Sequence, residues 1–338
     1  MTRSYYRPIV QSDDASPASA LLLAGGWGWF THVEVLRRGS ASKVINAERI
    51  PDQVKAALLD ERANIALRPQ IMGIVNATPD SFSDGGLHAV ASDAIAGGLA
   101  MAQAGADILD IGGESTRPGA KTVGADEEIA RIVPVIAGLR AQGFDRVISV
   151  DTRKADVARA ALAAGATLIN DVSGFTFDPE LAAVAAAAQV PVCVMHGPVD
   201  PEIMDNDPRY DDVLLEVYDF LEGRIAALEN KGIARHNIIA DPGIGFAKTL
   251  DHNLALLARL SLFHSLGVTL LLGASRKRFI GTIGGGVDAG DRAAGSIAVA
   301  LAGIAQGVQI VRVHDVAQTA QAVALWQASV RGAWAASG

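Results

Sequence analysis

Amide, carboxylate and cationic side chains end a series of short apolar stretches in this sequence, and such groups bind polar small molecules. The stretch QIMGIVN ends in Asn76, RVISVD in Asp151 and NIIAD in Asp241. The remaining candidates at such ends are Glu114, Arg117, Asn170, Asp171, His196, Ser275, Lys277, Arg312 and His314. Strand ends are commonly polar because loops are solvated, so one such residue alone does not indicate a site.

Four of these side chains suit the flat edge of a heterocycle. A carboxylate accepts hydrogen bonds from ring N–H and amino groups, while amide and ammonium groups donate to ring oxygen and nitrogen atoms. The four residues are Asp151, Asn170, Asp241 and Lys277. Their combination predicts a site for one half of a ligand.

A second set suits phosphate. Cationic donors bind phosphate oxygens, and an amide oxygen is a ligand for a magnesium ion that bridges those oxygens. The donors are Arg117, Arg312 and His314, and the amide is Asn76. The arginines have a competing use, because they can pair with nearby acidic residues, which are Asp80, Asp84 and Glu114.

The elements that must hold these residues alternate in type. From residue 70 onward, eight apolar runs rich in Val, Ile and Leu are separated by alanine-rich helical patterns. Strands that are apolar throughout and separated by helices form parallel sheets buried on both faces. Eight such units predict an α/β fold, a (β/α)₈ barrel over residues 69–338, with its site at the carboxyl ends of the strands.

Several of the candidates should point into this barrel. Asn170 stands two residues from both Leu168 and Val172, and Arg312 and His314 share one face of the run IVRVHD. Side chains two positions apart on a strand lie on the same side of it. Polar groups gathered inside a barrel are costly unless a ligand or mutual pairing compensates them, which favours a site.

Residues 1–68 differ from the rest. They hold a glycine-rich AGGWGWF segment between short alternating segments such as THVEVLRRG. This pattern predicts a small β-containing N-terminal extension that packs on the barrel or, alternatively, mediates assembly, and it indicates no function.

Composition excludes several classes of protein. The chain has 338 residues, half of them hydrophobic, and a formal net charge of −8 with scattered basic residues, which argues against a nucleic-acid or anionic-membrane surface. Its one cysteine, Cys193, lies in an apolar run and is expected to be a buried hydrophobe. The absence of a signal-peptide pattern and of a transmembrane-length apolar run predicts a cytoplasmic protein.

A set of motifs carries a resemblance to a known family. In chain order they are GIVNATPDSFSDGG, DILDIGGESTRPGA, VISVDT, LINDVSG, DPGIGFAKT, GASRKRFIG and VRVHDV. The set, which covers roughly residues 70–320, resembles dihydropteroate synthase. The resemblance implies a TIM barrel that joins 6-hydroxymethyl-7,8-dihydropterin pyrophosphate to 4-aminobenzoate and releases pyrophosphate with Mg²⁺ present. It also implies a homodimer and a target for sulfonamides, which mimic 4-aminobenzoate.

The resemblance assigns roles by motif position. It implies that the pterin is bound by Asp151, Asn170, Met195, Asp241 and Lys277. It implies that the pyrophosphate lies near Asn76, Thr116, Arg117, Arg312 and His314, with Asn76 as the magnesium ligand. For 4-aminobenzoate it implies Thr116, Pro118, Phe246, Ser275 and Lys277.

Two other functions compete with a synthase. A pterin-dependent methyltransferase shares the barrel and the acids, but it has no use for the GESTRPG loop or for Arg312 and His314 as pyrophosphate ligands. A barrel that binds pterin without turning it over is the other alternative. The segment VMHGPVDPEIM also departs from the family pattern, which puts the contacts of His196 in question.

Overall fold

The computed structural model describes residues 3–62, 68–78, 86–115, 122–197, 208–286 and 288–333. Three predicted site residues, Thr116, Arg117 and Pro118, lie outside these ranges. In the part of the chain that is described, no helix has both the length and the apolar character needed to cross a membrane.

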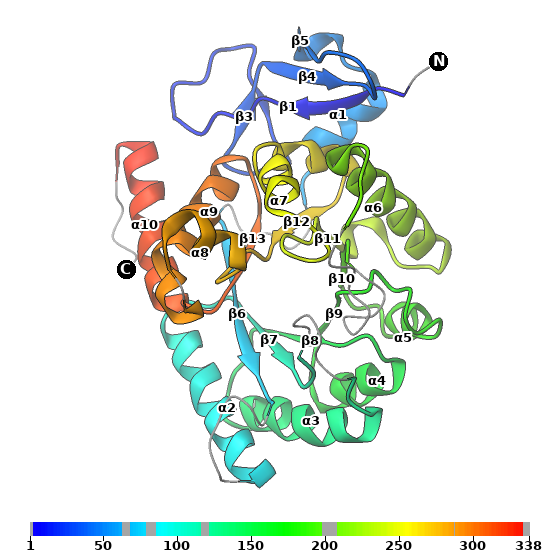
Figure 1. Ribbon diagram of the computed structural model, residues 1–338, viewed down its shortest axis with the longest axis vertical. Coiled ribbons are helices and arrows are strands. Elements are labelled where there is room, and N and C mark those ends of the chain that lie inside the picture. The colour runs from blue at the N-terminus through cyan, green and yellow to red at the C-terminus, as the bar shows by residue number, and fades with distance from the viewer. Residues whose placement is uncertain are drawn as a thin grey trace.

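Eight parallel strands close into a barrel, which confirms the predicted (β/α)₈ architecture (Figure 1). Each strand pairs with its neighbours in chain order, and the last pairs with the first to close the ring. The strands are β6 (Gln70–Asn76), β7 (Ile108–Gly112), β8 (Val147–Asp151), β9 (Leu168–Asp171), β10 (Val192–Met195), β11 (Ile238–Asp241), β12 (Thr269–Leu272) and β13 (Ile310–Val313). This arrangement brings the carboxyl ends of all eight strands to one mouth.

Helices surround this ring of strands (Figure 1). They are α2 (Gly86–Gln103), α3 (Ala125–Ala141), α4 (Ala155–Ala164), α5 (Leu181–Ala188), α6 (Val213–Asn230), α7 (Leu250–Leu257), α8 (Arg278–Gly284), α9 (Ala293–Ala305) and α10 (Val316–Arg331). Many are rich in alanine, the best helix former. Helix α4 is capped by Gly165, whose φ of 114° suits a residue without a Cβ atom.

One predicted helical stretch is divided. The run LDHNLALLARLSLFHSLG has a helical pattern along its length, but α7 ends at Leu257 and a 3₁₀ segment, η5 (Leu260–Leu266), follows it. Packing explains the change: the hydroxyl of Ser261 donates to the carbonyl of Pro8 at 2.9 Å, and Phe263 stacks on Tyr218. Tertiary contacts with Pro8 of the N-terminal residues and with Tyr218 of α6 thus override the local helical preference.

The barrel interior is layered. Its lower layer is apolar and takes one residue from each of seven strands: Met72, Ile108, Leu168, Cys193, Ile239, Leu271 and Ile310. Cys193 is fully buried there, as predicted. Two positions further along the same strands, where side chains point the same way, polar residues predominate: Asp110, Asn170, Asp241 and Arg312, together with Met195. The apolar layer therefore supports a polar layer at the mouth.

Residues 3–62 form a sheet and hairpin beside the barrel, seen in blue in Figure 1. Strands β1 (Tyr5–Pro8), β4 (His32–Leu36) and β5 (Lys43–Asn46) pair in antiparallel fashion. Strands β2 (Leu21–Leu22) and β3 (Trp29–Phe30) form a ladder, and η1 (Ala47–Arg49) and α1 (Asp52–Leu59) follow. The segment has a small core of its own around Phe30, Val33 and Leu58.

Polar contacts join this segment to the barrel helices. The hydroxyl of Tyr5 donates to Asp219 of α6 at 2.9 Å, and the indole of Trp27 donates to the carbonyl of Ile304 at 3.0 Å. Tyr5 is buried against the barrel core, with its ring edge-on to Tyr218. We therefore propose that residues 1–68 are an extension whose folding is coupled to that of the barrel, residues 69–338.

We expect Tyr5→Ala to lower the free energy of unfolding of the barrel by about 3 kcal/mol, because it leaves a cavity beside Tyr218 and removes a hydrogen bond. Urea unfolding followed by barrel fluorescence and by circular dichroism measures this loss. Val44→Ala, at an exposed position on β5, is the control and should change little. If the urea concentration at the midpoint of barrel unfolding were unchanged in Tyr5→Ala, the extension would fold independently of the barrel.

Candidate active site

The polar layer is organised around Arg312. Its Nε atom donates to Oδ2 of Asp110 at 2.6 Å, and its Nη2 atom donates to Oδ2 of Asp151 at 2.7 Å. The amide of Asn170 donates to the same Asp110 oxygen at 3.1 Å. These contacts bring together side chains from four strands, since β7, β8, β9 and β13 each supply one. Predicted residues Asp151, Asn170 and Arg312 thus lie in one network.

Asp110 belongs to this network but was not among the site residues predicted from the sequence. It is fully buried, and its Oδ1 atom has no hydrogen-bond partner among the described residues. The signal was present in the run DILDIG, where a carboxylate interrupts an apolar strand instead of ending it. A buried carboxylate at such a position needs a cation or a donor, which Arg312 and Asn170 supply.

Burial raises the pKa of both predicted pterin-binding carboxyls. The pKa of Asp151 rises to about 7, because loss of solvent and the charge of Asp110 outweigh the attraction of Arg312. The pKa of Asp241 rises to about 6 by burial, although the Gly243 amide donates to its Oδ1 at 2.7 Å. Both carboxyls therefore change protonation close to neutral pH.

An apolar wall and an ammonium group complete this part of the mouth. Val172, Met195 and Phe246 form a small buried cluster. The Nζ atom of Lys277 lies 3.7 Å from the centre of the Phe246 ring, a cation–π contact. Burial and the charge of Arg312 lower the pKa of Lys277 to about 8. The wall can thus contact a flat ring while the lysine donates to its edge.

Ser275 and His314 form a pair beside Lys277. The Ser275 hydroxyl oxygen accepts from the His314 backbone amide at 3.2 Å and lies 3.0 Å from Nδ1 of its imidazole. Burial, followed by the charge of Arg276, lowers the pKa of His314 to about 4. The lowered pKa favours a neutral imidazole at pH 7, whereas residue type alone suggested a cationic donor. When the hydroxyl donates to Nδ1, the proton remains on Nε2, which can still donate to an anion.

Asn76 ends β6 at the mouth, and its side chain is exposed. No cluster of three or more His, Cys, Asp or Glu side chains able to hold a metal occurs within the described ranges. Magnesium commonly takes one or two protein oxygens and completes its shell with substrate phosphates and water. One exposed amide oxygen fits this mode of binding and does not fit a site built from protein ligands alone.

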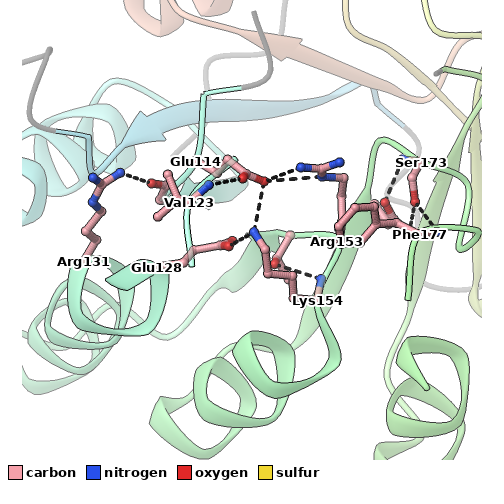
Figure 2. Close-up of polar contacts among 11 residues, drawn as sticks. Glu114, Val123, Glu128, Arg131, Arg153, Lys154, Ser173 and Phe177 are labelled. Carbon is pink, nitrogen blue, oxygen red and sulfur yellow. Dashed lines mark hydrogen bonds and ion pairs between the residues drawn. The ribbon is translucent and has the colours of Figure 1, made fainter. Parts of the chain in front are cut away.

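Glu114 lies in a separate charged cluster with Glu128, Arg153 and Lys154 (Figure 2). Its Oε2 atom accepts from Arg153 at 3.0 Å and from Lys154 at 3.1 Å, and Lys154 also pairs with Glu128 at 2.6 Å. The other oxygen of Glu114 accepts from the Val123 amide at 2.7 Å. Glu114 thus ties together the two ends of the loop between β7 and α3.

Two other predicted strand-end residues have structural contacts. Asp171 is fully buried and accepts hydrogen bonds from the amides of Ser173 and Phe175, which closes the turn after β9. His196 is half-buried, and its Nδ1 atom lies 2.9 Å from Nζ of Lys248. Neither residue joins the network of Arg312.

Comparison with known proteins gives a consistent set of similarities. Residues 72–314 match the family model described as pterin binding enzyme. A dihydropteroate synthase from Escherichia coli K12 is 45% identical over 262 residues, which are 78% of this chain and 92% of that protein.

Solved structures give the same result. The dihydropteroate synthase of Xanthomonas albilineans with 4-aminobenzoic acid has 49% identity and a TM-score of 0.73, covering 78% of this chain and 93% of that one. Its structure in complex with 7,8-dihydropteroate has 46% identity and a TM-score of 0.71, covering 78% and 94%.

We expect Arg312→Met to lower the free energy of unfolding by about 3 kcal/mol, because it leaves two buried carboxylates without their cation. The loss should be greater at about pH 8 than at about pH 5.5. The pKa of Asp151 in the folded protein exceeds its ordinary 3.8, so the folded protein loses stability as the pH rises from 3.8 towards the folded pKa. Removal of Arg312 raises the folded pKa further, so the loss continues to a higher pH. Urea unfolding at the two pH values measures the difference.

Arg68→Met is the matched control. Arg68 pairs with Asp107 at the surface, so its loss should cost at most about 1 kcal/mol at either pH. Equal losses at both pH values in Arg312→Met would contradict the charge balance described for the mouth.

Proposed function

The chain belongs to the pterin-binding enzyme family and within it to the dihydropteroate synthases, and from this premise we propose how its barrel mouth performs the reaction. The enzyme condenses 6-hydroxymethyl-7,8-dihydropterin pyrophosphate with 4-aminobenzoate to give 7,8-dihydropteroate and pyrophosphate. The observation that carries the proposal is the polar layer, in which carboxylates, an amide and an arginine converge above an apolar floor.

In this proposal the pterin lies on the polar layer. The ionised carboxylates of Asp151 and Asp241 accept hydrogen bonds from ring N–H and amino groups, and Asn170 and Lys277 donate to the ring. Met195 contacts the face of the ring. The support is geometric, because these buried groups come from neighbouring strand ends and face the mouth.

The pyrophosphate lies further out in the proposal, near Asn76, Thr116, Arg117, Arg312 and His314. His314 donates through one neutral N–H, and Arg312 remains bound to its two carboxylates while its charge attracts the anion. Asn76 would hold Mg²⁺ together with the phosphate oxygens, and the ion supplies positive charge that stabilises the leaving pyrophosphate.

For 4-aminobenzoate we assign Thr116, Pro118, Phe246, Ser275 and Lys277. Phe246 and Lys277 are already in contact, which supports an aromatic face beside an ammonium group that attracts a carboxylate. Sulfonamides, which mimic this substrate, should compete for the same place.

The chemistry breaks the C–O bond to pyrophosphate and forms a C–N bond to the amine. We infer that the C–O bond breaks first, so that the methylene-pterin becomes cationic, and that Asp151 and Asp241 stabilise this charge. The amine then attacks a carbon already held in place, and its proton leaves to water or pyrophosphate. The chain needs to supply neither a nucleophile nor a strong base. A homodimeric state and a cytoplasmic location remain predictions.

We expect the purified protein to release pyrophosphate only when the pterin pyrophosphate, 4-aminobenzoate and Mg²⁺ are all present. A coupled phosphate assay with each component omitted in turn measures this dependence. Binding of the pterin without any release would favour the alternative of a barrel that binds pterin without turning it over.

We expect His314→Ala to weaken binding of the pterin pyrophosphate by roughly tenfold, the loss of one hydrogen bond to a charged group, because Nε2 no longer donates to phosphate. Binding of 6-hydroxymethylpterin, which lacks the pyrophosphate, should not change. Isothermal titration calorimetry with both ligands separates the two effects. An equal loss for both ligands would place His314 at the pterin instead of the phosphate.

A further inference from the structure

We propose that Lys248 is a positioning residue that ties the loop after β10 to the loop after β11 and so sets the place of Asp241 and Phe246. The inference rests on the proposed function of the mouth, because it concerns how the pterin-binding wall is held. Lys248 has no part in the chemistry described above. It stands in the motif DPGIGFAKT, but that motif assigned it no role and it does not end a strand.

The ammonium group of Lys248 is enclosed by acceptors. Its Nζ atom donates to the backbone carbonyls of Gly243 at 2.9 Å, Phe246 at 3.0 Å and His196 at 3.2 Å. It also lies 2.9 Å from Nδ1 of His196. Two of these four acceptors belong to the loop after β10 and two to the loop after β11, so one side chain joins both loops.

The joined loops carry residues of the proposed pterin site. The Gly243 amide donates to Oδ1 of Asp241 at 2.7 Å, and the His196 amide donates to the Asp241 carbonyl at 3.1 Å. Phe246 supports Lys277 through the contact of 3.7 Å. A shift in either loop would therefore move the carboxylate and the aromatic wall together.

Gly243 shows how closely the two loops approach. Its φ is +69°, and a Cβ atom at this position would lie 1.9 Å from the carbonyl oxygen of His196. The backbones meet at this point without room for a side chain. The same carbonyl accepts from Lys248, so the lysine satisfies an oxygen at the point of closest approach.

An apolar side chain could fill this space, but it would leave three backbone carbonyls without the donor that joins them. The charged and titratable groups that face the ammonium are His196, Asp241 and Lys277. Burial lowers the pKa of His196 to about 3, so its neutral Nδ1 can accept a hydrogen bond from the lysine ammonium. Burial also lowers the pKa of Lys248 to about 7, although Asp241 opposes this shift.

Lys248→Met tests the proposal, with Arg62→Met as the matched control. Arg62 also donates to backbone carbonyls, those of Ala57 at 2.6 Å and His264 at 3.3 Å, but it belongs to the extension. Both variants remove a cation that satisfies carbonyl groups, and both should lower the unfolding midpoint. Only Lys248→Met should weaken binding of the pterin pyrophosphate, by roughly tenfold.

Amide hydrogen exchange in the ligand-free protein gives a second readout. In Lys248→Met the amides of Gly243 and His196 should exchange faster than in wild type, while Arg62→Met leaves both rates unchanged. If Lys248→Met does not fold, Lys248→Gln, which keeps two N–H donors, serves with the same criteria.

Two results would overturn the proposal: unchanged pterin affinity in a folded Lys248 variant, or equal losses of affinity in the Lys248 and Arg62 variants. Failure of wild type to bind the pterin is a different result, since it would contradict the proposed function. In that case, unchanged amide hydrogen exchange at Gly243 and His196 in the Lys248 variant would still refute the link between the two loops. Faster exchange at these amides would support it.

Discussion

The ion pairs of Arg312 with Asp110 and Asp151 are the contacts on which the rest of the site depends. Two carboxylates inside a barrel repel one another and lose their hydration, and an arginine between them offsets part of both costs. The geometry requires β13, near the end of the chain, to lie close to the consecutive strands β7 and β8, which a closed barrel provides. The cluster keeps a net negative charge, which suits a ligand that donates hydrogen bonds and becomes cationic during the reaction.

Other charged groups in this structure link loops instead of binding ligand. Glu114 joins both ends of the loop after β7 to Arg153, and Lys248 joins the loops after β10 and β11. Each uses a charge where hydrogen bonds to several partners are needed at once. The mouth therefore has one set of charged groups, around Arg312, that faces the substrate and a second set that fixes the positions of the loops.

Much of the fold follows from the sequence because continuous apolar runs and alanine-rich helical patterns are local signals. Asn76, Asp151 and Asp241 end their strands as their runs predict. Asp110 could not be assigned a partner from sequence, since its pairing with Arg312 depends on closure of the barrel between residues about 200 positions apart. The division of α7 from η5 was equally hidden, because contacts with the extension cause it.

The charge states of the site residues also could not be predicted from the sequence. Residue type predicts an ionised aspartate and a titrating histidine, whereas burial moves Asp151 to a pKa of about 7 and His314 to about 4. These shifts depend on how much solvent each group loses and on which charges face it, and both are properties of the packed barrel.

Proton exchange on pterin binding is the measurement that tests this account most directly. Calorimetric titration of 6-hydroxymethylpterin at about pH 6, in two buffers of different ionisation enthalpy, gives the number of protons exchanged. Because the ligand donates to ionised carboxylates, binding should release protons from Asp151 and Asp241 at this pH, and release should disappear above about pH 8. Binding without release, or with proton uptake, would contradict the claim that buried carboxyls held by Arg312 recognise the pterin.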